Sequence, residues 1–258
     1  MMQVPFTVTF LGTGTSGGVP MVACNCVVCT SSNSKDKRLR SSILIRTATT
    51  TVVIDTTPDF RQQMLRENVQ QLDAIVYTHP HKDHIAGLDD VRAYNYFSSK
   101  AMPIYVNAIT EKRLRNEFDY AFAEALYEGV PQLQLMPITP SPFTIGDIHL
   151  TPILVMHYKM PVYGYRIGSF TYITDANAIT EVERNKIRGS QVMVINTLRK
   201  EPHLAHFTLQ EALQVVQDVG VPQAYGTHIS HMLGTHEQLS AELPAYLQLA
   251  YDGLQLQF

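Results

Sequence analysis

Residues 78–84, with the sequence THPHKDH, constrain this chain more than any other stretch. They follow the apolar run 72–77 (LDAIVY), whose β-forming residues and flanking turn residues predict a buried strand over residues 73–78. If the chain is still extended just beyond that strand, His79 and His81 point to one side, because side chains alternate along a strand. Two imidazoles spaced in this way can bind one metal ion.

Asp83 and His84 come after the chain turns. Asp83 is a candidate N-cap for a short helix over residues 85–87, and from there both residues would face a second metal ion. Neutral imidazole and carboxylate are ligands that first-row divalent metals select. The alternative is a solvated polar loop with accidental histidines, but four ligand-type residues in six positions rarely follow a buried strand by chance.

Three cysteines, Cys24, Cys26 and Cys29, form a C-x-C-x-x-C pattern near the N-terminus. They cannot all pair within one chain, and their spacing is too tight for a disulfide framework, so we expect reduced thiols or a metal site. Thiolates with this spacing can supply three corners of a tetrahedral zinc site, and the fourth must come from elsewhere. Three reduced cysteines with a structural role are the alternative.

Composition narrows the class of protein. The chain has 258 residues, 45% of them hydrophobic, and a formal net charge of −3, which suits one soluble domain. It contains no apolar run of about 18 residues, and its first residues (MMQVPF) lack the regions of a signal peptide, so we expect no membrane span and a cytoplasmic location. The 20 basic and 23 acidic residues argue against nucleic acid as a partner. We expect the basic run 35–40 (KDKRLR) to be a solvated loop, unless one of its arginines reaches a substrate phosphate.

Two further polar residues have candidate roles outside these motifs. Asp59 is expected to cap a helix that begins at Phe60. Arg92 follows the histidine segment in a stretch that we expect to be helical, and its planar guanidinium could bind a substrate phosphate. An ordinary surface arginine is the alternative for Arg92. Residues 110–127 predict an amphipathic helix that packs on the core or forms a lid.

The pattern H-x-H-x-D-H, formed by residues 79–84, resembles the signature of the metallo-β-lactamase superfamily of binuclear metallohydrolases. The resemblance implies an α/β fold of four layers, an αββα sandwich in which two mixed β-sheets are flanked by helices. It also implies one domain over residues 1–258, with a helical insertion at about 88–127. In such a fold, separate strand ends converge on the metals.

The resemblance also implies which residues bind the metals. The ligands would be His79, His81 and His157 for the first ion, Asp83, His84 and His228 for the second, and Asp175 as the bridge between them. A bridging position suits a carboxylate because one of its oxygen atoms can serve two cations. Asp55 would lie beneath the metals and orient the histidine segment without binding a metal itself.

The cysteines together with residues 227–231 (THISH) are similar to the phosphoribosyl 1,2-cyclic phosphate phosphodiesterase family of phosphonate degradation. That similarity implies a structural zinc site completed by His231. It also implies a histidine that protonates the leaving group, a place that His206 fits best, with His203 as the rival. Residues 54–63 (IDTTPDFRQQ) look more like the pyrroloquinoline-quinone biosynthesis protein of the superfamily, which leaves the substrate open.

These patterns predict a binuclear metal-dependent phosphodiesterase that hydrolyses a small cyclic or nucleotide-like phosphodiester. The attacking group would be a metal-bridging hydroxide, with Asp83 holding one of the cations and His206 acting as the acid. The expected cofactors are two divalent ions at the active site, Zn or Mn, and one structural Zn.

Two alternatives remain at this stage. One is a metallo-hydrolase of another bond, such as a lactone or thioester. The other is a cofactor-biosynthesis protein with one metal. Under the leading hypothesis the partner is a small phosphodiester substrate, no membrane is involved, and the chain could form a homodimer.

Overall fold

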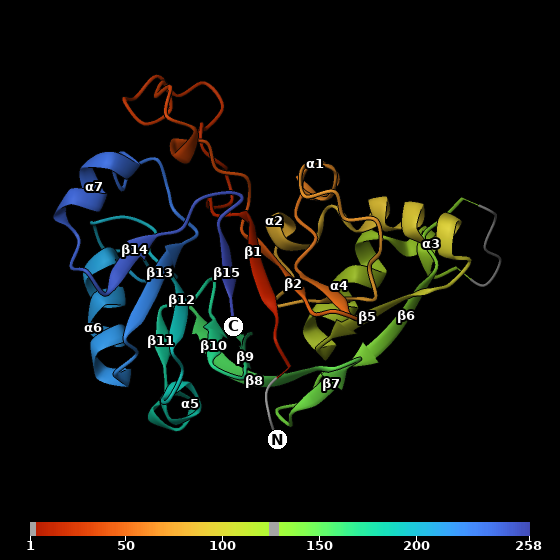
Figure 1. The fold of residues 1–258 in the computed structure, drawn as a ribbon. Helices are drawn as coiled ribbons and strands as arrows, with labels where there is room; N and C mark the ends of the chain where they lie inside the picture. Colours follow the sequence, from red (N-terminus) through yellow and green to blue (C-terminus); the bar gives the residue numbers. More distant parts are fainter. Residues whose placement is uncertain (1–3, 124–128) are drawn as a thin grey trace.

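Two β-sheets form the centre of the molecule in the computed structural model, which describes residues 4–123 and 129–258 (Figure 1). The first sheet has the order β15-β1-β2-β3-β4-β5-β6, and the second has the order β11-β8-β9-β10-β12-β13-β14, with β7 paired to β8. The strands of the first sheet are β1 (Thr7–Gly12), β2 (Ser42–Arg46), β3 (Thr51–Ile54), β4 (Ala74–Val76), β5 (Met102–Val106), β6 (Leu133–Pro137) and β15 (Gln255–Gln257). The strands of the second sheet are β7 (Phe143–Ile145), β8 (Ile148–His157), β9 (Met160–Ile167), β10 (Phe170–Tyr172), β11 (Ala178–Ile179), β12 (Val192–Asn196), β13 (Gln223–Thr227) and β14 (Leu247–Leu249).

Helices cover the outer face of each sheet (Figure 1). The α-helices are α1 (Phe60–Arg66), α2 (Lys82–Ile85), α3 (Arg92–Ser98), α4 (Ala108–Glu117), α5 (Glu181–Ile187), α6 (Leu209–Val219) and α7 (His236–Glu242). Three short 3-10 helices are η1 (Ser34–Asp36), η2 (Leu88–Val91) and η3 (Asp119–Ala121). Side chains of α1 and α4 pack on the first sheet, and side chains of α5 and α6 pack on the second. None of the helices in the described residues is long and apolar enough to cross a membrane.

The alternation of side chains along each strand produces three hydrophobic layers. In β4, Val76 packs into the core between the two sheets, while its neighbour Ile75 packs into the layer under α1 and α4. Both sheets are mixed, because β1-β2-β3 and β8-β9-β10 are antiparallel while β3-β4-β5-β6 and β10-β12-β13-β14 are parallel. The predicted fold class, an αββα sandwich of two mixed sheets, is therefore confirmed.

The parallel strands determine where functional side chains gather. β3, β4, β10 and β13 each end just before polar segments, namely Asp55, residues 78–84, Asp175 and His228. The carboxyl ends of parallel strands in one sheet point the same way, so the loops that follow them meet at one edge. Both sheets contribute such loops here, and the polar segments meet between them.

The local predictions for Asp83 and for residues 110–127 were wrong, and the prediction for Asp59 is confirmed only in its position. Asp83 lies within the first turn of α2, and His81 occupies the N-cap position. Asp59 occupies the N-cap position of α1 but makes no capping hydrogen bond, because its carboxylate accepts from the backbone N–H and the guanidinium of Arg40. The amphipathic helix expected over 110–127 ends at Glu117 as α4, and its expected Leu126 and Tyr127 lie outside the described residues.

The segment 88–127, expected as a helical insertion, also contributes a strand. β5 lies between β4 and β6 in the first sheet, so this part of the segment belongs to the sandwich itself. α6 begins after Thr208, which forms a capping box with Glu211.

Arg38, in the basic run 35–40, is buried, so the expectation of a solvated loop was wrong there. Its guanidinium donates to Oγ1 of Thr13 at 2.8 Å and to the carbonyl oxygen of Ala250 at 2.5 Å, and it lies 3.2 Å from Nδ1 of His236. Since a guanidinium can only donate, Nδ1 of His236 must accept, which requires a neutral ring. Burial and the charges of Arg38 and Lys35 lower the pKa of His236 to about 4.

This arrangement predicts a pH-dependent loss of stability. The pKa of His236 in the folded chain, about 4, lies below the unfolded value of 6.5, so between these values the unfolded chain binds a proton that the folded chain does not. The free energy of unfolding should therefore fall as pH drops from 6.5 to 4.5, by about 2 kcal/mol more in the wild type than in His236→Gln. Urea denaturation of both proteins at the two pH values measures this difference, and equal losses would contradict it.

Candidate active site

Four side chains from three segments form a first group of ligand atoms. His79 and His81 come from the loop after β4, His157 ends β8, and Asp175 follows β10. One ligand atom from each lies within 4.8 Å of those of the other three. Nε2 of His79 lies 3.1 Å from Nδ1 of His81 and 3.6 Å from Oδ2 of Asp175.

A second group overlaps the first and shares one residue with it. Asp83 and His84 in α2 meet His228, which follows β13, and the same Asp175. Oδ1 of Asp175 lies 3.3 Å from Nε2 of His84 and 3.0 Å from Nδ1 of His228. The structure thus brings together all seven residues named as metal ligands and places Asp175 in both groups.

Three residues of the site have left-handed backbone conformations that are uncommon outside glycine. The φ angles are 67° for Asp55, 40° for Asp175 and 55° for His228. Each lies within three residues of the end of a strand, β3, β10 or β13. Such conformations cost of order 1–3 kcal/mol each and persist where the surrounding structure imposes them, which is typical of functional sites.

Asp55 holds the histidine segment from beneath. Its Oδ1 accepts from the backbone N–H of Thr78 at 2.8 Å, and its Oδ2 accepts from Oγ1 of Thr78 at 2.7 Å and from Nδ1 of His84 at 2.8 Å. The bond from Nδ1 of His84 leaves Nε2 facing the second group. Asp55 therefore lies where the resemblance implies, fully buried and outside both ligand groups.

Threonines next to two of the ligand residues make further hydrogen bonds to them. The sequence patterns did not predict a role for these threonines. Oγ1 of Thr78 lies 2.9 Å from Nδ1 of His79, and Oγ1 of Thr174 donates to Oδ1 of Asp175 at 2.6 Å. Their signal in the sequence is a repeated pair, a threonine at a strand end directly before a ligand. The carbonyl oxygen of Ala205, which accepts from Nδ1 of His157 at 2.8 Å, has no such signal because it belongs to the backbone.

The charges and unpaired atoms of the site fit divalent cations. Among the described residues, no lysine or arginine forms an ion pair with Asp55, Asp83 or Asp175. Burial opposes ionisation of Asp175, but the charges of His228 and His84 outweigh it and hold the pKa of that carboxyl well below its usual value. Nε2 of His84 and Nδ1 of His228 are buried close to Oδ1 of Asp175 but make no hydrogen bond of good geometry. Buried imidazole nitrogens beside carboxylates that no lysine or arginine neutralises are what a metal centre requires.

His206 lies over these ligands. Its ring centroid is 4.6 Å from that of His157 and 4.8 Å from that of His228, and its Nδ1 is buried without a partner. His203 is exposed and contacts the ring of His206 at 5.0 Å. The structure therefore places His206 against the ligand groups and His203 one ring farther out. Burial lowers the pKa of His206 to about 3, so its ring is neutral before substrate binds.

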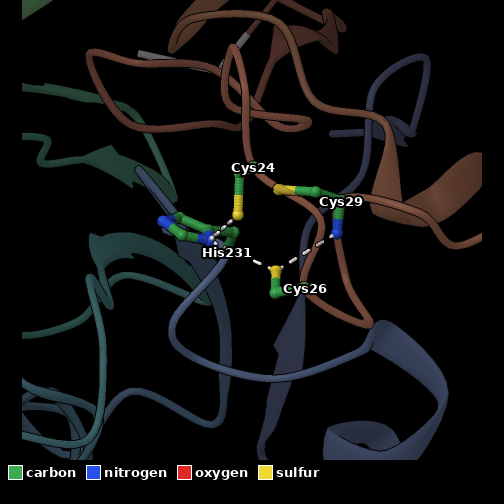
Figure 2. Close-up of side chains that lie close together, drawn as sticks. All are labelled: Cys24, Cys26, Cys29 and His231. Carbon is green, nitrogen blue, oxygen red and sulfur yellow. Dashed lines mark hydrogen bonds between the residues drawn. The ribbon is translucent and has the colours of Figure 1, made fainter.

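The cysteines and His231 form a separate cluster (Figure 2). Nδ1 of His231 lies 3.4 Å from Sγ of Cys24 and 3.3 Å from Sγ of Cys26, and a ligand atom of each of the four residues lies within 4.8 Å of the others. The hydrogen bond from His231 lowers the pKa of Cys26 to about 6, while burial raises that of Cys29 to about 11. Three thiols and one imidazole at these distances fit a tetrahedral zinc ion, which would displace the remaining thiol protons.

Arg92, the candidate phosphate ligand, is not brought to either metal group. Its side chain is 54% exposed and forms an ion pair with Asp89 at 3.3 Å. It lines an outer cavity together with Tyr96 and Phe97, and none of the seven ligand residues contributes to that cavity. Its guanidinium is paired with Asp89 of the preceding η2 instead of reaching the ligand groups.

The contacts of Asp55 predict the effect of replacing it. Asp55→Asn keeps one acceptor oxygen but cannot satisfy both Thr78 and His84, so His84 loses the hydrogen bond that orients it. Metal affinity should fall by about 10- to 100-fold while the protein remains folded. Competition with a chromogenic chelator measures the affinity, and an unchanged affinity in a folded variant would refute the orienting role.

Comparisons with known proteins are consistent with this geometry. Residues 50–229 match the family described as "Beta-lactamase superfamily domain". A crystal structure described as a new diphosphatase from the PhnP family is 40% identical, has a TM-score of 0.94, and is covered over 98% of its length by the whole of this chain.

Several curated proteins match by sequence, and two of them illustrate the range. An octanoyltransferase of Porphyromonas gingivalis is 36% identical over 248 residues, which is 95% of this chain and 50% of that protein. Coenzyme PQQ synthesis protein B of Methylorubrum extorquens is 30% identical over 133 residues, 46% of this chain and 44% of that protein. The chain therefore spans about half the length, or less, of these curated relatives.

Proposed function

The chain belongs to the metallo-β-lactamase superfamily, and we propose that it is a metallo-hydrolase, namely a phosphodiesterase for a small cyclic or nucleotide-like phosphodiester. The observation that carries the proposal is the position of Asp175 in both ligand groups. One carboxylate shared by two sets of ligands suits a pair of cations, and paired cations are typical of enzymes that displace groups at phosphorus. The full-length likeness to a PhnP-family diphosphatase supports the same class of bond.

In this proposal each group of side chains has its own role in the site. His79, His81 and His157 would hold one divalent ion, Zn or Mn, and Asp83, His84 and His228 would hold the other. Bound there, the two ions would lower the pKa of water towards ~7 and neutralise charge on phosphoryl oxygens. Asp55 keeps His84 oriented, and the cluster of Cys24, Cys26, Cys29 and His231 would hold a structural Zn.

His206 would protonate the leaving group. Its neutral ring lies against two of the ligand histidines, so a phosphodiester in the site would lie beside it. The negative charge of the substrate favours the protonated ring, which could then donate that proton to the departing alkoxide. His203 is exposed and would need to move inward to do the same.

A screen of substrates tests the proposal. The purified protein, with its metals counted, is assayed with 2′,3′-cyclic nucleotides, phosphoribosyl cyclic phosphate and bis(p-nitrophenyl) phosphate. We expect turnover of at least one cyclic phosphodiester and of the aryl diester, lost on chelation and restored by Zn or Mn. Failure of the protein, with both groups loaded, to cleave any phosphodiester would overturn the proposal.

A second candidate is hydrolysis of an acyl thioester. It is favoured by the relative named octanoyltransferase, in which a region matching nearly the whole of this chain makes up half of the protein. An octanoyl thioester is therefore included in the screen. Turnover of the thioester without turnover of any phosphodiester would favour this candidate over the first.

A further inference from the structure

Two hydrogen bonds flank His206 in the loop between β12 and α6. The backbone N–H of Phe207 donates to the carbonyl oxygen of Ala176 at 2.7 Å. On the other side of His206, the carbonyl oxygen of Leu204 accepts from Nδ2 of Asn177 at 3.0 Å. Both partners belong to the segment that directly follows the ligand shared by the two groups, so the loop is attached to that segment.

The side chain of Asn177 has a second partner beside the site. Its Oδ1 accepts from the backbone N–H of Tyr158 at 2.8 Å. Tyr158 follows the ligand His157 and starts the two-residue turn between β8 and β9, with a φ of 57°. A positive φ is uncommon for a residue with a large side chain, and such a conformation persists where the surrounding contacts impose it.

The amide of Asn177 therefore joins the turn after a ligand to the loop that carries His206. The two segments also meet at Ala205, whose carbonyl oxygen accepts from Nδ1 of His157 at 2.8 Å. The ring centroids of His157 and His206 lie 4.6 Å apart. Both polar atoms of the Asn177 side chain thus contact the backbone segments on which a ligand and the candidate acid depend.

We infer that Asn177 is a positioning residue for His206, which it keeps over the ligand groups by fixing Leu204 to the turn after His157. Without this amide the loop retains the Phe207 contact on one side of His206 and loses its attachment on the other. Proton transfer requires a donor within hydrogen-bond reach of the leaving oxygen, so a loosely held ring is a poorer acid. The inference rests on the proposed function, to which it adds the residue that holds the acid in place.

Turnover of two substrates by Asn177→Ala tests the inference. Turnover of a 2′,3′-cyclic nucleotide, whose alkoxide leaving group needs a proton, should fall by about tenfold. Turnover of bis(p-nitrophenyl) phosphate should fall by about twofold or less, because its phenolate leaves without a proton. Metals are counted in each preparation. A general structural defect would lower both rates alike, since both substrates use the same ions and the same phosphoryl oxygens.

A double-mutant cycle shows whether Asn177 acts through His206. In His206→Ala the acid is already absent, so the further change Asn177→Ala should cause no additional loss with the cyclic nucleotide. If the losses multiply in the double variant, the two residues act separately and the inference is overturned.

Asn95→Ala is the matched control. Oδ1 of Asn95 accepts from the backbone N–H of Gln132 at 3.0 Å, and its Nδ2 donates to the carbonyl oxygen of Lys100 at 2.8 Å. The variant thus removes the same kind of link between two backbone segments, at the outer cavity to which no ligand residue contributes. It should leave the ratio of the two turnover rates unchanged.

Asn177→Asp guards against a variant that fails to fold. It keeps the size of the side chain and the acceptor for Tyr158, but it has no N–H to donate to Leu204. It should therefore show the same selective loss with the cyclic nucleotide. Wild-type turnover of this substrate by a folded Asn177→Asp would overturn the role of the Leu204 contact.

Hydrogen exchange examines the loop without turnover. In metal-loaded Asn177→Ala, the backbone amides of residues 203–207 should exchange at least about tenfold faster than in the wild type, because local opening no longer breaks the amide link. Asn95→Ala should leave their exchange unchanged.

The outcomes separate this role from the proposed function. Equal losses on both substrates in Asn177→Ala, unchanged exchange in residues 203–207, or the same selective loss in Asn95→Ala would each overturn the positioning role while the phosphodiesterase stands. Failure of the metal-loaded wild type to cleave any phosphodiester overturns the proposed function and the positioning role with it.

Discussion

Replacing Asp175 by Ala should reduce phosphodiester turnover by at least about 10³-fold, because the variant loses the one side chain common to both ligand groups. His84 and His228 would keep their positions but would lose the carboxylate oxygen that lies between them. The number of ions bound at the active site should fall below two per chain. Steady-state assays and elemental analysis of the same preparation measure both effects.

A surface carboxylate provides the control for this variant. Asp218→Ala removes an acidic side chain that pairs with Arg184 and belongs to neither ligand group. It should keep both turnover and metal content. If Asp175→Ala binds two active-site ions and turns over normally, the bridging role is wrong.

Replacing His206 by Ala should lower turnover by about 10²-fold or more for a cyclic nucleotide, whose alkoxide leaving group needs a proton. Bis(p-nitrophenyl) phosphate releases a stable phenolate, so its turnover should fall much less. The difference between the two substrates is the decisive quantity. A neutral ring that only donated a hydrogen bond to phosphate would affect both substrates alike, because both have the same phosphoryl oxygens.

Two other histidines serve as comparisons. His149→Ala removes an exposed ring on β8 that contacts Thr144 of β7, and it should have no effect on either substrate. His203→Ala should have a smaller effect than His206→Ala, because His203 lies outside the ring of His206. A larger loss in His203→Ala with the cyclic nucleotide would transfer the acid role to His203.

The strand that carries the first ligands could be predicted because it depends on a local pattern. The buried strand before residues 78–84 is visible as a run of β-forming residues, and it appears as β4. Asp175 and His228 came from the family resemblance, and the parallel strands before them bring both residues to the ligands that follow β4. The C-x-C-x-x-C spacing similarly indicated a metal-binding cluster, although its fourth member, His231, was predicted only from a family resemblance.

Other features depend on contacts between residues far apart in the chain. Asp59 was expected to cap a helix with its side chain, but its carboxylate accepts hydrogen bonds from Arg40. Arg38 was expected to be solvated, but its guanidinium donates hydrogen bonds to Thr13 and Ala250. Neither contact has a periodic signal in the sequence. The expected place of Arg92 was wrong for a similar reason, since the direction of Arg92 depends on how η2 packs on α1 and α3 on η2.

The most direct test of the account is a crystal structure of the metal-loaded protein with anomalous diffraction at the metal absorption edges. The account predicts two peaks about 3.5–4 Å apart on either side of the Asp175 carboxylate, as in other two-metal sites, and a third peak among Cys24, Cys26, Cys29 and His231. A single peak, or none, between His79 and His228 in the presence of ample metal would contradict it.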